Sequence, residues 1–322
     1  MIKLFFIPLF ILFLITKGKI RSLTIFEFLL SIVLHYGIFV LAMPILILVR
    51  RTGQQPWNVL LQVNTEPIVL SAYCFTFKTA LAATIINAFF GLILAWVLVR
   101  YEFPGKKMLD TTVDLPLALP ASVGGLTLMT VFNEKGWIKP IYSWLGIRIV
   151  FSPLGVLIAM IFVSLPFVVR TLQPVLQNME QDLEEAAWCL GASPWTTFWH
   201  IIFPPLTPSL LTGTALGFSR ALGEYGSIVL IASNIPMKDL VISVLLFQKL
   251  EQYDYRGATI IASFALIISF SALLLINKIQ NFVYLWLLGV VGLEPATSIT
   301  PRWYTTKLCY TPCFNFSLSS NK

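Results

Sequence analysis

The stretch EEAAWCLGASPWTTFWHIIFPP, residues 184–205, interrupts one of the most apolar regions of the chain. Its acidic start suits the positive end of a helix dipole, and Gly191 is able to take the left-handed conformation that ends a helix. Ser193 offers a side-chain oxygen as an N-cap, and Pro194 fits the first position of a new helix. The stretch therefore predicts two short helices that meet at an angle outside the bilayer, the second ending at the Pro-Pro pair that begins with Pro204.

This bent segment, residues 180–205, is called the elbow below. It is either a connector at the membrane surface or a docking site for a soluble protein. The adjacent Ala186 and Ala187 would let another surface approach the backbone closely, and carboxylates such as Glu185 would meet basic groups on it. Because the two caps fix the bend, a push on one helix would reach the membrane spans.

The composition indicates an integral membrane protein. Of 322 residues, 57% are apolar and only 11% are charged, whereas about a quarter of the residues in soluble domains are charged. The net charge of +7 comes from basic residues scattered singly or in pairs. That pattern is typical of loops flanking membrane spans rather than of a nucleic-acid surface.

Six apolar runs are long enough to cross the membrane. A helix needs about 20 mostly apolar residues to cross the hydrocarbon, and a backbone in lipid must satisfy its own hydrogen bonds. We therefore expect an all-α protein with six core spans, at residues 25–49, 79–99, 115–132, 153–169, 210–232 and 258–276. Basic residues balance between the two sets of loops and do not orient the helices.

The third run carries Pro116, Pro120, Gly124 and Gly125. These residues predict a kink or an unwound turn, which is tolerated only where other helices cover the freed backbone groups. We expect this run inside the bundle.

The two ends of the chain differ from the core at 25–281. Residues 1–24 form a short hydrophobic segment, which is signal-like, interfacial or a shortened extra span. Residues 282–322 are rich in Ser, Thr, Pro and Tyr, which predicts a disordered or non-essential tail.

The fifth run places charges inside a membrane span. Gly213, Gly217, Arg220 and Glu224 share one helical face, and the two glycines predict close helix packing. A lone charge at mid-bilayer costs about 2.5–3.5 kcal/mol, so the two charges are expected to pair. The pair is either a structural lock or part of a path where Arg220 attracts an anion. Arg170 is interpreted as a charge at the C-terminal end of span four.

Catalytic chemistry has no visible residues. The chain has no phosphate-binding loop of the Gly-x-x-x-x-Gly-Lys-Ser/Thr type and no hydrolase motif around His35 or His200. Cys309 and Cys313 lack further ligands nearby for a metal. We predict no catalytic residue, no cofactor and no metal site, so the chain is not expected to be an enzyme.

The elbow resembles the signature of permease subunits of bacterial-type ABC importers. That signature is Glu-Ala-Ala, three residues, Gly, nine residues and Ile-x-Leu-Pro. Here it reads Glu185, Ala186, Ala187, Gly191, Ile201 and Pro204, with Phe203 in place of the Leu. The stretches RYEFPGKKMLDTTVDLPLALPASVGGLTL, SLPFVVRTLQPVLQ, FSRALGEYGSIVLIASNIP and QYDYRGATIIAS narrow the likeness to sulfate/thiosulfate permeases of the CysT type, over about residues 25–281.

The resemblance implies a transport role with several partners. The six signature residues would couple the chain to separate ATP-binding subunits, seated at a cytoplasmic or stromal elbow between spans four and five. A second, CysW-like permease subunit, an extracellular or periplasmic sulfate-binding protein and membrane lipid complete the expected partners. The membrane would be the bacterial plasma membrane or the inner membrane of the plastid (chloroplast) envelope.

Three alternatives stay open. A molybdate-type ABC permease shares the same signature. A secondary anion transporter would use Arg220 and Glu224 as an ion relay without a soluble partner, and a structural membrane anchor would carry no solute.

Overall fold

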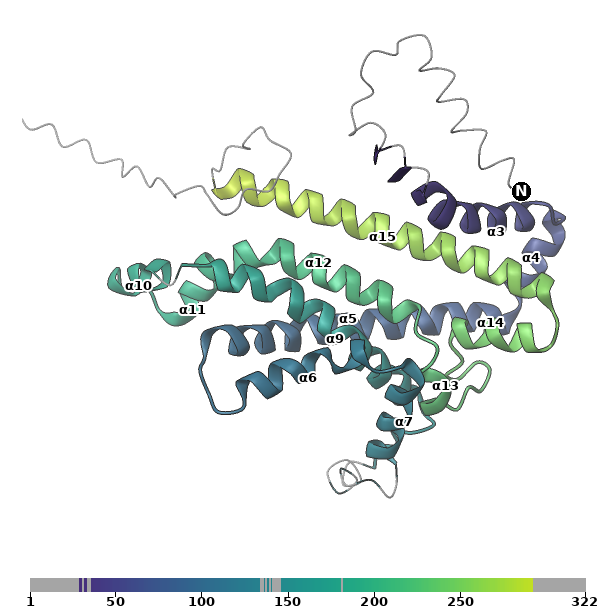
Figure 1. The fold of residues 1–322 in the computed structure, drawn as a ribbon, viewed down its shortest axis with the longest axis horizontal. Helices are drawn as coiled ribbons and strands as arrows, with labels where there is room; N and C mark the ends of the chain where they lie inside the picture. Colours follow the sequence, from purple (N-terminus) through teal and green to yellow (C-terminus); the bar gives the residue numbers. More distant parts are fainter. Residues whose placement is uncertain are drawn as a thin grey trace, which may run out of the picture.

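A computed structural model of the chain describes residues 29–30, 32–33, 36–133, 136, 138, 140, 146–180 and 182–291. Every regular element in this part of the chain is a helix, which confirms the expected all-α class (Figure 1). In chain order the helices are η1 (Ile38–Ala42), α3 (Met43–Gly53), α4 (Trp57–Thr65), α5 (Pro67–Arg100), α6 (Lys106–Ala118), α7 (Ala121–Phe132), α9 (Pro153–Asn178), α10 (Asp182–Cys189), α11 (Pro194–Thr197), η2 (Phe198–Ile202), α12 (Phe203–Leu222), α13 (Ile228–Ile231), α14 (Ile242–Glu251) and α15 (Tyr255–Val291).

Four helical runs are long and apolar enough to cross a membrane. They are α5, α9, the run Pro194–Leu222 made of α11, η2 and α12, and Tyr255–Gln280 in α15. The pair α6 and α7 makes a fifth when it is counted as one broken span. The described residues thus hold four or five of the six expected spans, and the first expected span, 25–49, lies partly outside them.

The third expected span is two helices rather than one. Helix α6 begins at Lys106, and α7 leaves it at an angle of 120°. The break falls at Leu119 and Pro120, whose ψ angles of 139° and 137° are extended. A residue that precedes proline avoids the helical region, so Pro120 ends α6 at this point. The predicted kink is confirmed, and the helical pair begins at Lys106 rather than at residue 115.

The fifth expected span, 210–232, is also wrong in its bounds. Helix α12 ends at Leu222, and Ile228–Ile231 form the separate helix α13. A turn closes between them because the Glu224 carboxylate accepts a hydrogen bond from the backbone N–H of Ser227 at 2.9 Å. In the other direction the same helical run reaches back to Pro194.

Other helices are longer than their apolar runs. Helix α5 begins at Pro67 rather than 79, and α9 continues past residue 169 to Asn178. Helix α15 reaches Val291, so the expected tail boundary at residue 282 lies within it. Residues 1–28 and 292–322 lie outside the described part, as do the expectations made for them.

The core forms where α5, α9 and α12 lie side by side (Figure 1). Close packing of α12 on α9 depends on two glycines. A Cβ atom at Gly213 would overlap Thr171 Oγ1 and lie 3.0 Å from Val168 Cα, and one at Gly217 would lie 3.3 Å from the carbonyl oxygen of Ser164. The predicted small-residue contact is confirmed. In Figure 1, α10 and α11 lie at one end of the bundle, and α4, α13 and α14 lie at the other.

Candidate functional site

The elbow bends at Gly191 as its sequence predicts. Gly191 has φ +83°, a left-handed value. Its N–H donates to the carbonyl of Trp188 at 2.9 Å, and the N–H of Ala192 donates to the carbonyl of Ala187 at 3.0 Å. These two bonds form the Schellman motif that satisfies the last carbonyls of a helix. Helix α10 therefore ends in a defined turn rather than in a flexible loop.

The second arm begins as expected but does not end as expected. Ser193 Oγ accepts from the backbone N–H of Thr196 at 3.2 Å, and Pro194 opens α11. The helix does not stop at Pro204. A π-helical turn, η2, precedes α12. The prolines lie in the first turn of α12, where backbone N–H groups have no partner within the helix, so their missing N–H breaks no hydrogen bond. The second arm is therefore continuous with a membrane span.

The residues of the elbow differ in how far their side chains are exposed to solvent. Glu185 and Ala186 are exposed, and Leu190 is 88% exposed. Ala187 is buried, so the expectation that both alanines present a surface to a partner is wrong for Ala187 within this chain. Its small side chain instead faces the fold. Ile201 is half-buried, and so is Pro204.

One expected partner-facing carboxylate is used internally. Glu184 Oε1 lies 2.6 Å from Arg100 Nη2, and both side chains are about nine-tenths buried. Arg100 Nη1 also reaches the carbonyl of Met179 at 3.5 Å, and its guanidinium lies 5.7 Å from the ring centroid of Trp96. Arg100 thus fastens the start of α10 and the end of α9 to α5. This pair was not predictable from local sequence patterns, because 84 residues separate its members.

A groove of about 810 Å³ runs between α5 and the elbow. Its walls include Trp96, Trp188, Trp195 and Trp199. Tryptophan is enriched at membrane–water interfaces, where its ring is buried and its N–H is wet. The tryptophans of this groove are thus typical of a segment at a membrane–water interface.

Arg220 and Glu224 are paired, as expected, but not at mid-span. Arg220 Nη1 lies 2.7 Å from Glu224 Oε2, at the end of α12 that faces away from the elbow. The Glu224 side chain is 1% exposed, and that of Arg220 is 36% exposed. The Glu224 carboxylate is thus buried, while the guanidinium of Arg220 is partly exposed.

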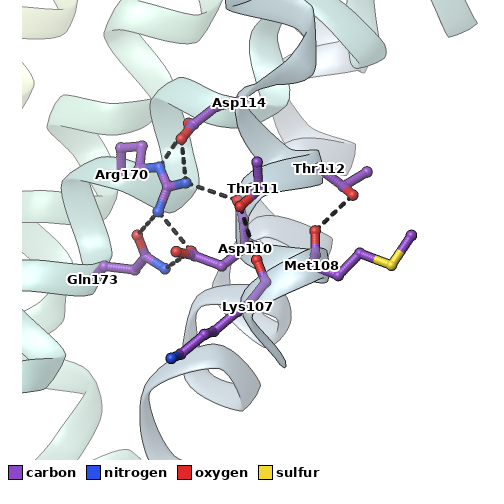
Figure 2. Close-up of polar contacts among 8 residues, drawn as sticks. All are labelled: Lys107, Met108, Asp110, Thr111, Thr112, Asp114, Arg170 and Gln173. Atoms are coloured by element: carbon purple, nitrogen blue, oxygen red, sulfur yellow. Dashed lines mark hydrogen bonds and ion pairs between the residues drawn. The ribbon is translucent and has the colours of Figure 1, made fainter. Parts of the chain in front are cut away.

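Arg170 is not a charge at the end of its helix, because α9 continues for two more turns to Asn178. Figure 2 shows it between α6 and α9, where it meets two aspartates. Its Nη1 lies 2.7 Å from Asp110 Oδ1, and its Nη2 lies 2.5 Å from Asp114 Oδ2. Our reading of the sequence missed this cluster. The aspartates at i and i+4 in KKMLDTTVDLP were the available signal.

Comparison with known proteins places this geometry in a family. The sequence profile of the binding-protein-dependent transport system inner membrane component matches residues 87–285, a range that includes the elbow. The chain belongs to this family. As an integral membrane permease subunit of an ABC transporter, it is not itself the ATPase.

Named relatives of the permease come from plants, algae and a bacterium. A sulfate transport system permease protein of Marchantia polymorpha is 81% identical over 280 residues, covering 87% of the permease and 97% of the relative. One from Synechocystis is 53% identical, with 77% and 86% coverage. These sources fit a plastid or bacterial membrane.

Solved structures share the fold of the permease. A bacterial alginate ABC transporter, in complex with a pentasaccharide-bound periplasmic protein, matches with a TM-score of 0.67 at 18% identity. The match covers 83% of the permease and 97% of that chain. A second alginate importer structure gives 0.65 at 19% identity, with 80% and 94% coverage.

Proposed function

We propose that the permease is the membrane-spanning subunit of an ATP-driven sulfate/thiosulfate importer. Its relatives at 53–81% identity bear the name of sulfate transport permeases, which supports sulfate over molybdate as cargo. The capped elbow is the observation that carries the transport mechanism, since it gives a rigid, exposed surface continuous with a membrane span.

ATP-binding subunits dock on this elbow and hydrolyse the ATP. Glu185 and Ala186 lie on the exposed face, which supports their contact with the partner. Gly191 sets the angle between the arms. Ala187 lets α10 seat closely on the fold, while Ile201 and Pro204 lie where the elbow becomes α12. ATP binding draws two elbows together and moves the spans, and hydrolysis resets them.

Arg220 and Glu224 line the anion path in this proposal. The guanidinium keeps an accessible face, which would attract a dianion. Glu224 holds the other face and weakens the attraction, so the anion is released rather than retained.

A second, CysW-like permease subunit and an external sulfate-binding protein complete the complex. Membrane lipid surrounds the exposed apolar side chains of α5 and α15, such as Phe89 and Phe270. The complex lies in the inner membrane of the plastid envelope or in a bacterial plasma membrane. None of the described features favours a secondary transporter.

Uptake of labelled sulfate tests the cargo. The permease is reconstituted into liposomes with candidate ATP-binding, CysW-like and sulfate-binding subunits. We expect uptake that requires ATP, resists protonophores and is competed by thiosulfate more strongly than by molybdate. Molybdate as the better competitor would reassign the cargo, and uptake that stops with protonophores rather than ATP depletion would overturn the importer.

A further inference from the structure

We propose that Asp110, Asp114 and Arg170 form a clamp that makes α6 move with α9, and so carries motion of the elbow to the bent pair α6–α7. The proposal rests on the importer function above and deepens it. The three residues act through the helices that carry them, so they are positioning residues for transport.

The contacts of the clamp come from both helices (Figure 2). Arg170 binds Asp114 in bidentate fashion, with Nε to Oδ1 at 2.8 Å and Nη2 to Oδ2 at 2.5 Å. It also bonds Asp110 twice, through the carboxylate at 2.7 Å and the backbone carbonyl at 2.8 Å. Gln173 completes the cluster by donating to Asp110 Oδ1 at 2.9 Å. Bidentate pairs of this kind fix orientation as well as distance.

Apart from the clamp, α6 makes few apolar contacts with the rest of the bundle. Val113 is the one buried residue of this helix, whereas Met108 is 78% exposed and Leu117 is 51% exposed. The face of α6 that meets α9 carries Asp110, Val113 and Asp114, at i, i+3 and i+4. Two of these three side chains are charged, so the attachment of α6 depends on Arg170.

The clamp is close to the elbow. Arg170 lies eight residues before the end of α9, which is about 12 Å along a helix. The chain then passes Met179 and enters α10 at Asp182. Arg100 binds both the carbonyl of Met179 and the carboxylate of Glu184. A displacement of α10 is therefore passed, through Arg100 and Met179, to the end of α9, the helix that carries Arg170.

The far end of the bent pair meets the proposed anion path. A Cβ atom at Gly125 would lie 2.7 Å from Ser227 Cα, so α7 contacts this residue closely. Ser227 Oγ donates to the carbonyl of Ala121 at 2.9 Å, and its N–H donates to Glu224. Helices α6 and α7 thus connect the clamp to the Arg220–Glu224 pair.

The experiment compares uptake with ATP hydrolysis in the reconstituted complex. We expect Arg170→Ala and the double variant Asp110→Asn/Asp114→Asn each to lower sulfate taken up per ATP by about tenfold or more, as for loss of a coupling energy. Charge reversal, Arg170→Asp with Asp114→Arg, is expected to restore part of the ratio that Arg170→Asp alone loses. Glu102→Gln is the control, because Glu102 is 87% exposed, lies just before α6 and pairs with Lys106 at the start of that helix rather than with α9.

The outcomes separate the two proposals. Wild type without ATP-driven uptake refutes the importer. Wild type that transports, beside clamp variants with an unchanged ratio of uptake to ATP, refutes the clamp alone. Variants that assemble less but keep that ratio per assembled complex also refute it, because the cluster would then only stabilise the fold.

Discussion

Replacement of Gly191 by proline is expected to abolish ATP-driven uptake while the ATP-binding subunits still hydrolyse ATP. Gly191 has φ +83°, whereas proline is held near −65°. Proline also lacks the N–H that Gly191 donates to Trp188. The turn would open, the angle between α10 and α11 would change, and a push on α10 would no longer reach α12.

A graded series separates the bend from general damage. Gly191→Asn is expected to keep most of the uptake, because asparagine tolerates the left-handed region. Gly191→Ala is expected to show intermediate uptake. A Cβ at this position meets nothing within 4 Å, so the cost is limited to the backbone strain of a left-handed alanine, about 1–2 kcal/mol. Gly146→Pro is the matched control at a second left-handed glycine, φ +64°, which precedes α9 at its opposite end. Full uptake in Gly191→Pro would refute the role of the bend.

Arg220→Ala is expected to show the second large effect. Removal of the guanidinium leaves the buried Glu224 carboxylate without its cationic partner, while the backbone N–H of Ser227 still donates to it. Breaking one half of a buried ion pair costs about 3–5 kcal/mol. We therefore expect less assembled complex and almost no uptake, as measured by gel filtration and by labelled sulfate.

The double variant Arg220→Ala/Glu224→Gln decides between a structural lock and an anion path. It removes both charges, and the glutamine amide oxygen still accepts from Ser227. We expect assembly to recover, while uptake per assembled complex stays about tenfold or more below wild type, because the steering charge is gone. Lys249→Ala, which removes another ion pair at the same end of the bundle, is the control. Wild-type uptake by the double variant would remove Arg220 from the path.

The bend of the elbow could be predicted from the sequence because it depends on local effects. Gly191, Ser193 and Pro194 act through their own backbone and side chains, and the structure has the bend, the cap and the helix start that they predict. The same reasoning failed at Pro204, because a π-helical turn before it lets the helix continue. It also failed for Ala187 and Glu184, whose orientation depends on how α10 packs on α5 and η2.

Span bounds were harder to predict because apolar runs and helices end for different reasons. Hydropathy ended span four before Arg170, but that charge is satisfied by two aspartates 56 and 60 residues earlier, so α9 continues. In the fifth run, the apolar residues after Leu222 suggested a longer helix. The turn closed by Glu224 and Ser227 ends it instead.

The most direct test of the central claim is a cross-linking measurement at the elbow. A photo-reactive amino acid is placed at Ala186, which is exposed on α10, or at Met237, which is 66% exposed near the opposite end of the bundle. Both variants are assembled with the ATP-binding subunit and checked for ATP-driven uptake. We predict a cross-link to that subunit from position 186 and none from position 237. An active complex that cross-links from 237 but not from 186 would contradict the account.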